Sequence, residues 1–137
     1  MKISTRGRYA IRVMLDLAEH NNGEFIPLMD IAKRQEISEK YLESIVSALS
    51  KNKLVAALRG KGGGYRLNRK PGEYRIGDLL RLTEGTLAPV ACLEYGAQPC
   101  AKAGECRTLP MWDKLNTMIN DYLDSVSLGE LMRDQEA

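Results

Sequence analysis

Apolar residues recur at helical spacing in five stretches of this 137-residue chain. A period near 3.6 residues is typical of helices with one buried face. We therefore predict helices over residues 5–20, 28–35, 38–52, 76–84 and 109–126. Two short runs, Leu54–Arg59 and Tyr65–Leu67, flank the glycine-rich segment Gly60–Gly64 and predict a β-hairpin. A polar turn, Asn68–Tyr74, is expected to follow it.

The third predicted helix has one apolar face and one polar face. Its apolar residues occupy positions i, i+3, i+4 and i+7: Leu42, Ile45, Val46 and Leu49. The opposite face carries Lys40, Glu43, Ser44 and Ser47. Together with the preceding helix and its short connection, this forms a candidate helix-turn-helix, whose second helix enters the major groove of DNA. Helix spacing alone leaves open a plain helix pair of a small domain.

The hairpin tip favours the DNA interpretation, since it carries Arg59 and Lys61 among its glycines. Such a loop could also cradle a nucleotide phosphate, but the spacing of a P-loop is absent. A basic tip directly after a helix-turn-helix is typical of a wing, whose arginine can enter a narrow minor groove. The alternative is an ordinary surface hairpin.

The net charge of +2 conceals an asymmetry along the chain. Residues 1–75 contain fifteen Lys and Arg against eight Asp and Glu, whereas residues 76–137 contain five against ten. The basic part favours contact with phosphates, and the acidic part predicts a different role. The basic residues near the start of the first helix are either a solvated face or a phosphate clamp: Lys2, Arg6, Arg8 and Arg12.

Other features limit the class of protein. No stretch approaches the ~20 apolar residues of a membrane span, and the first residues lack a signal-peptide pattern. We therefore expect a cytoplasmic protein with reduced thiols. The single histidine, His20, lies near a helix end, where a solvated or capping role is expected. No general base accompanies the cysteines, so we expect a binding protein and not an enzyme.

Helical periodicity disappears between Thr86 and Thr108, and all three cysteines lie there with the spacing Cys92-x7-Cys100-x5-Cys106. A loop of this length in a compact domain is usually functional. The C-x2–4-C pairs typical of zinc sites are absent, whereas iron–sulfur clusters accept irregular loops. The spacing leaves three interpretations open: metal or cluster ligands, redox-active thiols, or inert loop cysteines.

The last predicted helix carries an apolar stripe broader than one small core requires. Its members are Met111, Trp112, Leu115, Met118, Ile119, Tyr122, Leu123 and Val126. We expect this helix to contact another subunit, the alternative being a long core helix of the same domain. Ser127 and Glu130 then have the spacing of a capping box that opens a short final turn.

Several motifs combine into a resemblance that covers nearly the whole chain. They are Ser4-Thr5-Arg6-Gly7-Arg8-Tyr9-Ala10, Met14-Leu15-Asp16, Ile37-Ser38, Tyr41-Leu42-Glu43, Leu54-Val55, Arg59-Gly60, Gly62-Gly63-Gly64-Tyr65 and Leu128-Gly129-Glu130-Leu131. With these motifs the chain resembles the IscR-type iron–sulfur cluster regulators, of the winged helix-turn-helix repressor family that also includes NsrR and CymR. The three-cysteine loop is similar to IscR and not to CymR, which lacks it.

The resemblance implies a homodimer, crossed through the long helix, that binds a two-fold operator in double-stranded DNA. It also implies a [2Fe–2S] cluster held by Cys92, Cys100 and Cys106, and control of cluster-biogenesis genes. The fourth ligand departs from the pattern. The histidine common three residues after the last cysteine is Leu109 here, and the acid that NsrR-type proteins place in the first helix is Arg8.

The candidates for the fourth ligand are therefore Glu94, Glu105 or another oxygen or nitrogen donor. The alternative function is that of a cluster-free, CymR-like repressor of cysteine metabolism, controlled by a partner protein or by thiol oxidation.

The predicted architecture is mainly α with a small β-hairpin wing, in three segments. Residues 1–85 are the winged helix-turn-helix DNA-binding domain, residues 86–108 a cysteine-bearing sensor loop, and residues 109–137 a dimerisation helix and tail. The candidate DNA-binding residues are Ser4, Thr5, Arg8, Ser38, Lys40, Tyr41, Glu43, Ser44, Ser47, Arg59, Lys61 and Gly62. Glu43 is the most informative, because a carboxylate beside phosphates is unfavourable unless it accepts from cytosine N4.

Overall fold

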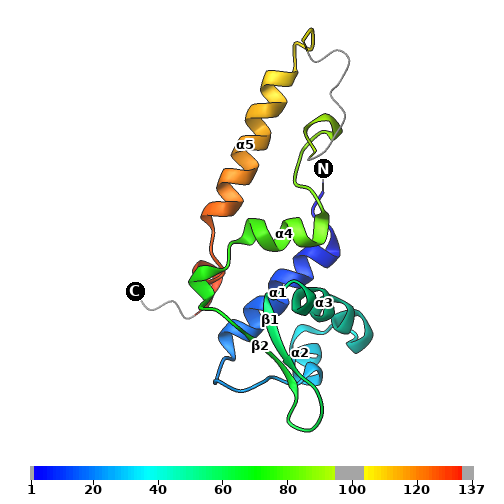
Figure 1. Cartoon of the computed structure of the whole chain (residues 1–137), viewed down its shortest axis with the longest axis vertical. Coiled ribbons are helices and arrows are strands. Elements are labelled where there is room, and N and C mark those ends of the chain that lie inside the picture. Colours follow the sequence, from blue (N-terminus) through cyan, green and yellow to red (C-terminus); the bar gives the residue numbers. More distant parts are fainter. Residues whose placement is uncertain (1, 95–103, 134–137) are drawn as a thin grey trace.

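The computed structural model describes residues 2–94 and 104–133. Within these ranges its elements are α1 (Thr5–Glu19), α2 (Leu28–Gln35), α3 (Glu39–Lys51), β1 (Val55–Leu58), β2 (Gly64–Leu67), η1 (Pro71–Glu73), α4 (Ile76–Glu84), η2 (Ala91–Leu93), α5 (Leu109–Ser125) and η3 (Gly129–Leu131). All the predicted helices and the hairpin are present in the predicted order (Figure 1).

Helix α1 is the centre of the fold. The Ser4 hydroxyl accepts a hydrogen bond from the Gly7 N–H at 2.9 Å and caps the helix. The helix buries Val13, Met14 and Leu17 completely or nearly so, and α2, α3, α4 and β2 all contact it. Most of the described chain is therefore held around one helix.

The helix-turn-helix forms as predicted. Glu36 caps the C-terminus of α2 in a left-handed conformation with φ 55°, and the next residue, Ile37, is buried. The Ser38 hydroxyl caps α3 by accepting from the Tyr41 N–H at 3.2 Å. The four apolar positions of α3 are all buried, so its polar face lies outward.

The two strands pair antiparallel, with Val55 opposite Leu67. The loop before α2 adds a short third segment, because Ile26 and Tyr65 exchange backbone hydrogen bonds of 2.8 and 2.9 Å. A side chain at Gly64 would collide with the Ile26 backbone, so this contact requires glycine. The hairpin, which we call the wing, is thus held through Gly64 and Tyr65 at the start of β2, and its tip projects outward (Figure 1).

Tyr74 corrects the prediction of a polar turn over Asn68–Tyr74. The Tyr74 ring is buried, and its hydroxyl donates to the Leu54 carbonyl at 2.8 Å while accepting from the Asn68 N–H at 3.1 Å. Burial raises the pKa of Tyr74 above its ordinary value. Tyr74 therefore joins the residue before β1 to the residue after β2 through its hydroxyl.

Helix α5 extends away from the rest of the molecule (Figure 1), and none of its residues is fully buried. Ile119 and Leu123 touch the core, whereas Met118 and Tyr122 are 59% and 68% exposed. The interpretation as a core helix is therefore wrong for this chain. No helix in the described ranges is both long enough and apolar enough to cross a membrane.

The segment after α5 returns to the DNA-binding domain. Ile76 donates its N–H to the Val126 carbonyl, and Leu128 donates to the Tyr74 carbonyl, each at 2.9 Å. Leu128 is fully buried, and the Ser127 hydroxyl accepts from the Glu130 N–H at 3.3 Å, as one half of the predicted capping box requires. Helix α5 is thus fastened to the domain at its C-terminal end.

Candidate nucleic-acid interface and cysteine-bearing segments

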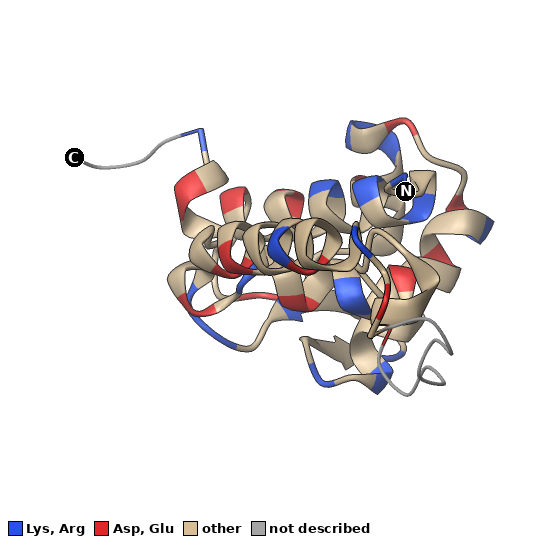
Figure 2. Ribbon diagram, turned by 90° about the horizontal axis from the view of Figure 1, so that it is seen from above, with Lys and Arg blue, Asp and Glu red and all other residues tan. Residues whose placement is uncertain are grey.

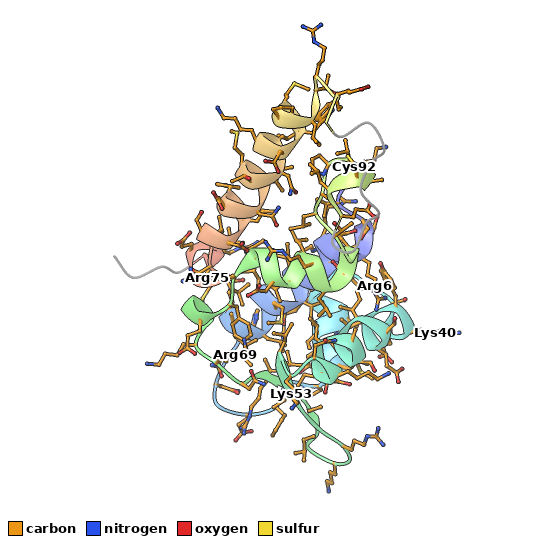
Figure 3. The ribbon with its side chains drawn as sticks, turned by 45° about the horizontal axis from the view of Figure 1, so that its top comes forward. Arg6, Lys40, Lys53, Arg69, Arg75 and Cys92 are labelled. Atoms are coloured by element: carbon orange, nitrogen blue, oxygen red, sulfur yellow. The ribbon has the colours of Figure 1, made fainter. Side chains whose placement is uncertain are left out.

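The outward face of α3 has the composition that DNA reading requires. Lys40, Glu43 and Ser44 are exposed and Ser47 is half-buried, and Figure 3 labels Lys40 projecting from the end of the helix. Because the opposite side of α3 is in the core, this polar side can enter a groove without disturbing the fold.

Ser44 already has a partner within the chain. The Arg6 guanidinium donates from Nη1 to the Ser44 hydroxyl at 2.9 Å and from Nη2 to the Ser44 carbonyl at 3.2 Å. Sequence reasoning placed Arg6 only in a basic run, and this bond between α1 and α3 was missed because the two residues are 38 positions apart.

The start of α1 combines structural and exposed groups. The N–H and the hydroxyl of Ser4 both donate to Glu84 Oε1, at 2.9 and 2.6 Å, so Ser4 joins α1 to the end of α4. Thr5 and Arg8 are exposed, with Arg8 Nη2 donating to the Thr5 hydroxyl at 3.3 Å. Of the predicted DNA contacts at this end, these two present polar atoms to solvent.

A buried carboxylate behind the helix-turn-helix was also missed. The Asp16 side chain is 0% exposed and accepts from Arg34 Nε at 3.0 Å, from Arg34 Nη2 at 2.7 Å and from Gln35 Nε2 at 2.9 Å. These bonds raise the pKa of Arg34. An aspartate within the apolar stripe of α1 was the available signal, since a buried acid requires a partner.

Two further residues near this network now have defined contacts. His20 follows the last residue of α1, and its Nδ1 lies 2.9 Å from the Asp16 carbonyl, which confirms the expected capping role. Arg12 donates to the side chain and the carbonyl of Gln35, at 3.1 and 2.8 Å. Two members of the basic run near the start of α1, Arg6 and Arg12, therefore hold helices together.

Ser38 and Tyr41 have structural contacts as well. The Ser38 hydroxyl is occupied in capping α3. The half-buried Tyr41 ring meets the Tyr9 ring edge-to-face, with 5.9 Å between centroids. Any contact of these two residues with DNA would be additional to these roles.

The wing tip carries two exposed basic side chains. Arg59, Lys61 and Gly62 are exposed, and neither cation forms an ion pair with any described residue. Gly60 and Gly62 have φ values of 91° and 77°, which favour glycine. Figure 2 shows Lys and Arg around much of the outer edge of the molecule, with Asp and Glu among them. Charge alone therefore does not single out a DNA interface, and the polar face of α3 and the wing tip remain the candidates.

The two described cysteines, Cys92 and Cys106, lie on segments at the other end of the molecule from the wing (Figure 1). Cys92 is exposed in η2, where Figure 3 labels it, and Cys106 is half-buried in the segment before α5. Cys100 lies outside the described residues. The Thr108 hydroxyl, 3.5 Å from Cys106 Sγ, lowers the pKa of the Cys106 thiol.

The described segments do not themselves assemble a metal centre. Figure 1 draws η2 beside α5 and residues 104–108 at the end of α5, and no three His, Cys, Asp or Glu side chains converge in the described ranges. Leu109 opens α5, Arg8 is at the start of α1, and Glu94 and Glu105 are exposed. On donor chemistry the thiols fit an iron–sulfur cluster, since both described cysteines are free and Cys106 is biased toward thiolate.

The chain is similar to known transcriptional regulators over nearly its whole length. Residues 3–134 match the Rrf2 model, described as an iron-dependent transcriptional regulator. The HTH-type transcriptional regulator IscR of Aliivibrio salmonicida is 43% identical over 136 residues, covering 99% of this chain and 80% of that protein. The IscR of Vibrio cholerae is 40% identical, covering 99% and 78%.

Two solved structures extend the similarity to the fold. The structure of T. potens IscR matches with a TM-score of 0.75 and 34% identity over 99% of this chain and 89% of that one. The structure of CymR, the global cysteine regulator of B. subtilis, matches with a TM-score of 0.76 and 35% identity over 96% and 95%. The predicted winged helix-turn-helix fold is confirmed, and so is the expectation of a regulator and not an enzyme.

Proposed function

Because this chain belongs to the Rrf2 family of iron-dependent transcriptional regulators, we propose that it is a homodimeric repressor whose operator binding is controlled by a [2Fe–2S] cluster. In this proposal residues 1–85 bind DNA, residues 86–108 sense, residues 109–137 dimerise, and the target genes serve iron–sulfur cluster biogenesis. The observations that carry the DNA-binding part are the exposed polar face of α3 and the exposed cations of the wing tip, which form no ion pair with any described residue.

On DNA, α3 occupies the major groove and the wing reaches the adjacent minor groove. Lys40 and Ser44 then contact phosphates or base edges, and Arg59 and Lys61 contact the minor groove and its backbone. Glu43 is exposed among these groups. Its carboxylate accepts from cytosine N4 and so makes binding depend on sequence.

The partner across the operator is a second copy of this chain, paired through α5. The exposed apolar side chains of α5 follow one another at helical spacing on one face: Met111, Leu115, Met118 and Tyr122. Water-exposed apolar patches of this kind usually mark contact surfaces. A two-fold axis through α5 would present two α3 helices to the two half-sites of a symmetric operator.

Cys92, Cys100 and Cys106 would hold the cluster, with Glu94 or Glu105 as the oxygen donor that completes the set. Bound there, the cluster would supply a link that forms or is lost with the iron supply or with oxidants. Cys92 lies in the segment after α4, and Cys106 lies in the segment before α5. A cluster held by cysteines of both segments would therefore link α4 to α5.

One such link already exists within the chain. Arg81 of α4 donates to both carboxylate oxygens of Asp124, at 2.8 and 2.9 Å, and to Asn120 at 2.7 Å. This contact holds the C-terminal half of α5. A second link near the N-terminal end of α5 would change how firmly the dimerisation helix is held to the DNA-binding domain, and with it the spacing of the two α3 helices.

A cluster-free repressor in the manner of CymR is the second candidate. It is favoured by the match to the CymR structure over 96% of this chain. Protein purified without oxygen separates the two. A brown product containing iron and sulfide supports the cluster, and a colourless, iron-free product supports the second candidate.

The DNA-binding part is tested by selection from a library of random duplexes with the purified full chain. We expect enrichment of one sequence with two-fold symmetry, because a dimer presents two identical α3 helices. No enrichment above a library passed over resin alone would contradict the proposal.

A further inference from the structure

We propose that the base of the wing is a second DNA-contact surface, which binds the phosphate backbone on the side of the wing opposite α3. This surface, the wing-base patch, consists of Lys53, Arg66, Arg69 and Lys70. The inference rests on the proposed DNA-binding function and adds to the contacts of α3 and the wing tip.

Three of the four residues of the patch line an open hollow of about 720 Å³. Arg66, Arg69 and Lys70 contribute to its wall, with the polar groups of Asn21 and Asn68 beside them. Figure 3 labels Arg69 and Lys40 on opposite sides of the DNA-binding domain. The patch is therefore distinct from the polar face of α3.

The two arginines are held in place without acidic partners. Arg66 donates to the Gly23 carbonyl at 2.7 Å and stacks on the Phe25 ring at 4.2 Å. Arg69 lies over the Tyr74 ring at 5.3 Å. Rings and carbonyls fix a guanidinium without cancelling its charge.

The remaining members strengthen the positive charge. Lys53 and Lys70 are exposed, and the Lys53 carbonyl accepts from the Asn68 side chain at 2.8 Å, which joins the turn before β1 to the segment after β2. Among the described residues none of the four cations lies in an ion pair. Glu73 also lines the hollow but pairs with none of them.

A surface of this charge can bind a polyanion. Its distance from the wing tip indicates that the polyanion is the same DNA duplex that the tip contacts. Each strand of the wing has four residues, so base and tip are separated by about 13 Å at ~3.3 Å per residue. A minor groove is about 7.5 Å deep, which leaves the base about 6 Å outside the rim when the tip fills the groove. Long basic side chains span that gap, so α3, the tip and the patch would meet one duplex in succession.

The test uses the double substitution Arg69→Gln and Lys70→Gln in the full chain. The slope of log affinity against log salt concentration is negative, and each lost phosphate contact reduces its magnitude by about 0.9. On a 40-base-pair random-sequence duplex we expect the magnitude of the slope to decrease by about 1.8. We expect the affinity at 0.1 M salt to decrease by up to roughly 60-fold. The ratio of affinities for the selected operator and the random duplex should stay the same, because phosphates carry no sequence information.

A matched control removes one charge elsewhere, with Arg75→Gln at the start of α4, and is compared with the single substitution Lys70→Gln. Arg75 is exposed and outside the patch. The slope of the control should remain that of the wild type, and an equal fall in control and test variants would overturn the inference in favour of a net-charge effect. The single substitution Lys70→Gln, at an exposed side chain, repeats the test with half the effect if the double variant fails to fold.

Hydroxyl-radical footprinting on the selected operator locates the contact. The wild type should protect backbone beyond the minor groove that the wing enters, and the double variant should lose that protection alone. Wild-type protein that binds no duplex would defeat both the proposed function and this inference. Wild-type binding with an unchanged slope and footprint in the double variant would defeat only the inference.

Discussion

Replacing Asp16 with Asn should destabilise the fold more than any surface substitution. The carboxylate is fully buried and accepts three hydrogen bonds, two from Arg34 and one from Gln35. An amide in its place keeps one acceptor and turns an N–H₂ group toward the donors of Arg34. The guanidinium is then left without its charge partner.

The magnitude follows from the geometry. Removing one partner of a fully buried ion pair costs about 3–5 kcal/mol. The Arg34 side chain is 33% exposed, so water replaces part of the lost interaction, and we expect about 2–3 kcal/mol. For a chain of 137 residues this corresponds to a fall in Tm of roughly 10 °C.

The assay is thermal and urea unfolding, followed by circular dichroism at one protein concentration because a dimer's stability depends on it. Asp30→Asn is the control, since Asp30 is exposed on α2 and acts on Arg34 only through its charge. The control should change stability by less than about 0.5 kcal/mol. An Asp16→Asn variant equally close to the wild type would refute the reasoning that this buried acid anchors α2.

Three further predictions concern the wing, its support and α5. Arg59→Ala should weaken operator binding about tenfold at fixed salt, and unchanged affinity in a filter-binding assay would count against the role of the wing. Tyr74→Phe should cost about 2 kcal/mol in urea unfolding, because the Leu54 carbonyl loses its donor. Since burial raises the pKa of Tyr74, its contribution is complete below the ordinary pKa of about 10 and is lost as the pH rises through the folded pKa. Wild-type stability should therefore fall more steeply above pH ~10 than that of Tyr74→Phe, and parallel pH curves would contradict this assignment. Met118→Glu combined with Tyr122→Glu should convert a dimer into a monomer in light scattering, and a variant that remains dimeric would exclude this face of α5 as the interface.

Periodicity was sufficient to predict the helices because each one carries apolar residues at helical spacing, which α1 to α4 bury and α5 leaves partly exposed. Leu42, Ile45 and Val46 show this for α3, since all three are buried where the pattern placed them. The polar face of α3 followed from the same pattern, because the side opposite a buried stripe faces water. This is why the reading face could be proposed before its surroundings were known.

Contacts between distant parts of the chain could not be predicted in this way. The partners of Asp16 are 18 and 19 residues away, and Arg81 and Asp124 are 43 apart. Whether such charges meet depends on how helices cross, which single-helix patterns do not encode. Tyr74 was misplaced for a similar reason, because its burial depends on the turn folding back beneath the wing.

The cluster ligands stay a prediction, since Cys100 lies outside the described residues and the fourth ligand is Glu94, Glu105 or another oxygen or nitrogen donor. Cys106 offers a partial indication, because the neighbouring Thr108 hydroxyl favours the thiolate that metals bind. The lowered thiol pKa concerns Cys106 alone, and it does not predict that the three cysteines lie close enough to bind one cluster.

The most direct test of cluster-controlled repression is the affinity of one oxygen-free preparation for the selected operator, before and after removal of its iron with a chelator. The account predicts a brown sample with two irons and two sulfides per chain. Its operator affinity should change at least about tenfold when the iron is removed, which corresponds to a coupling of about 1.4 kcal/mol. A sample that contains no iron, or one whose affinity is the same in both states, would contradict the account.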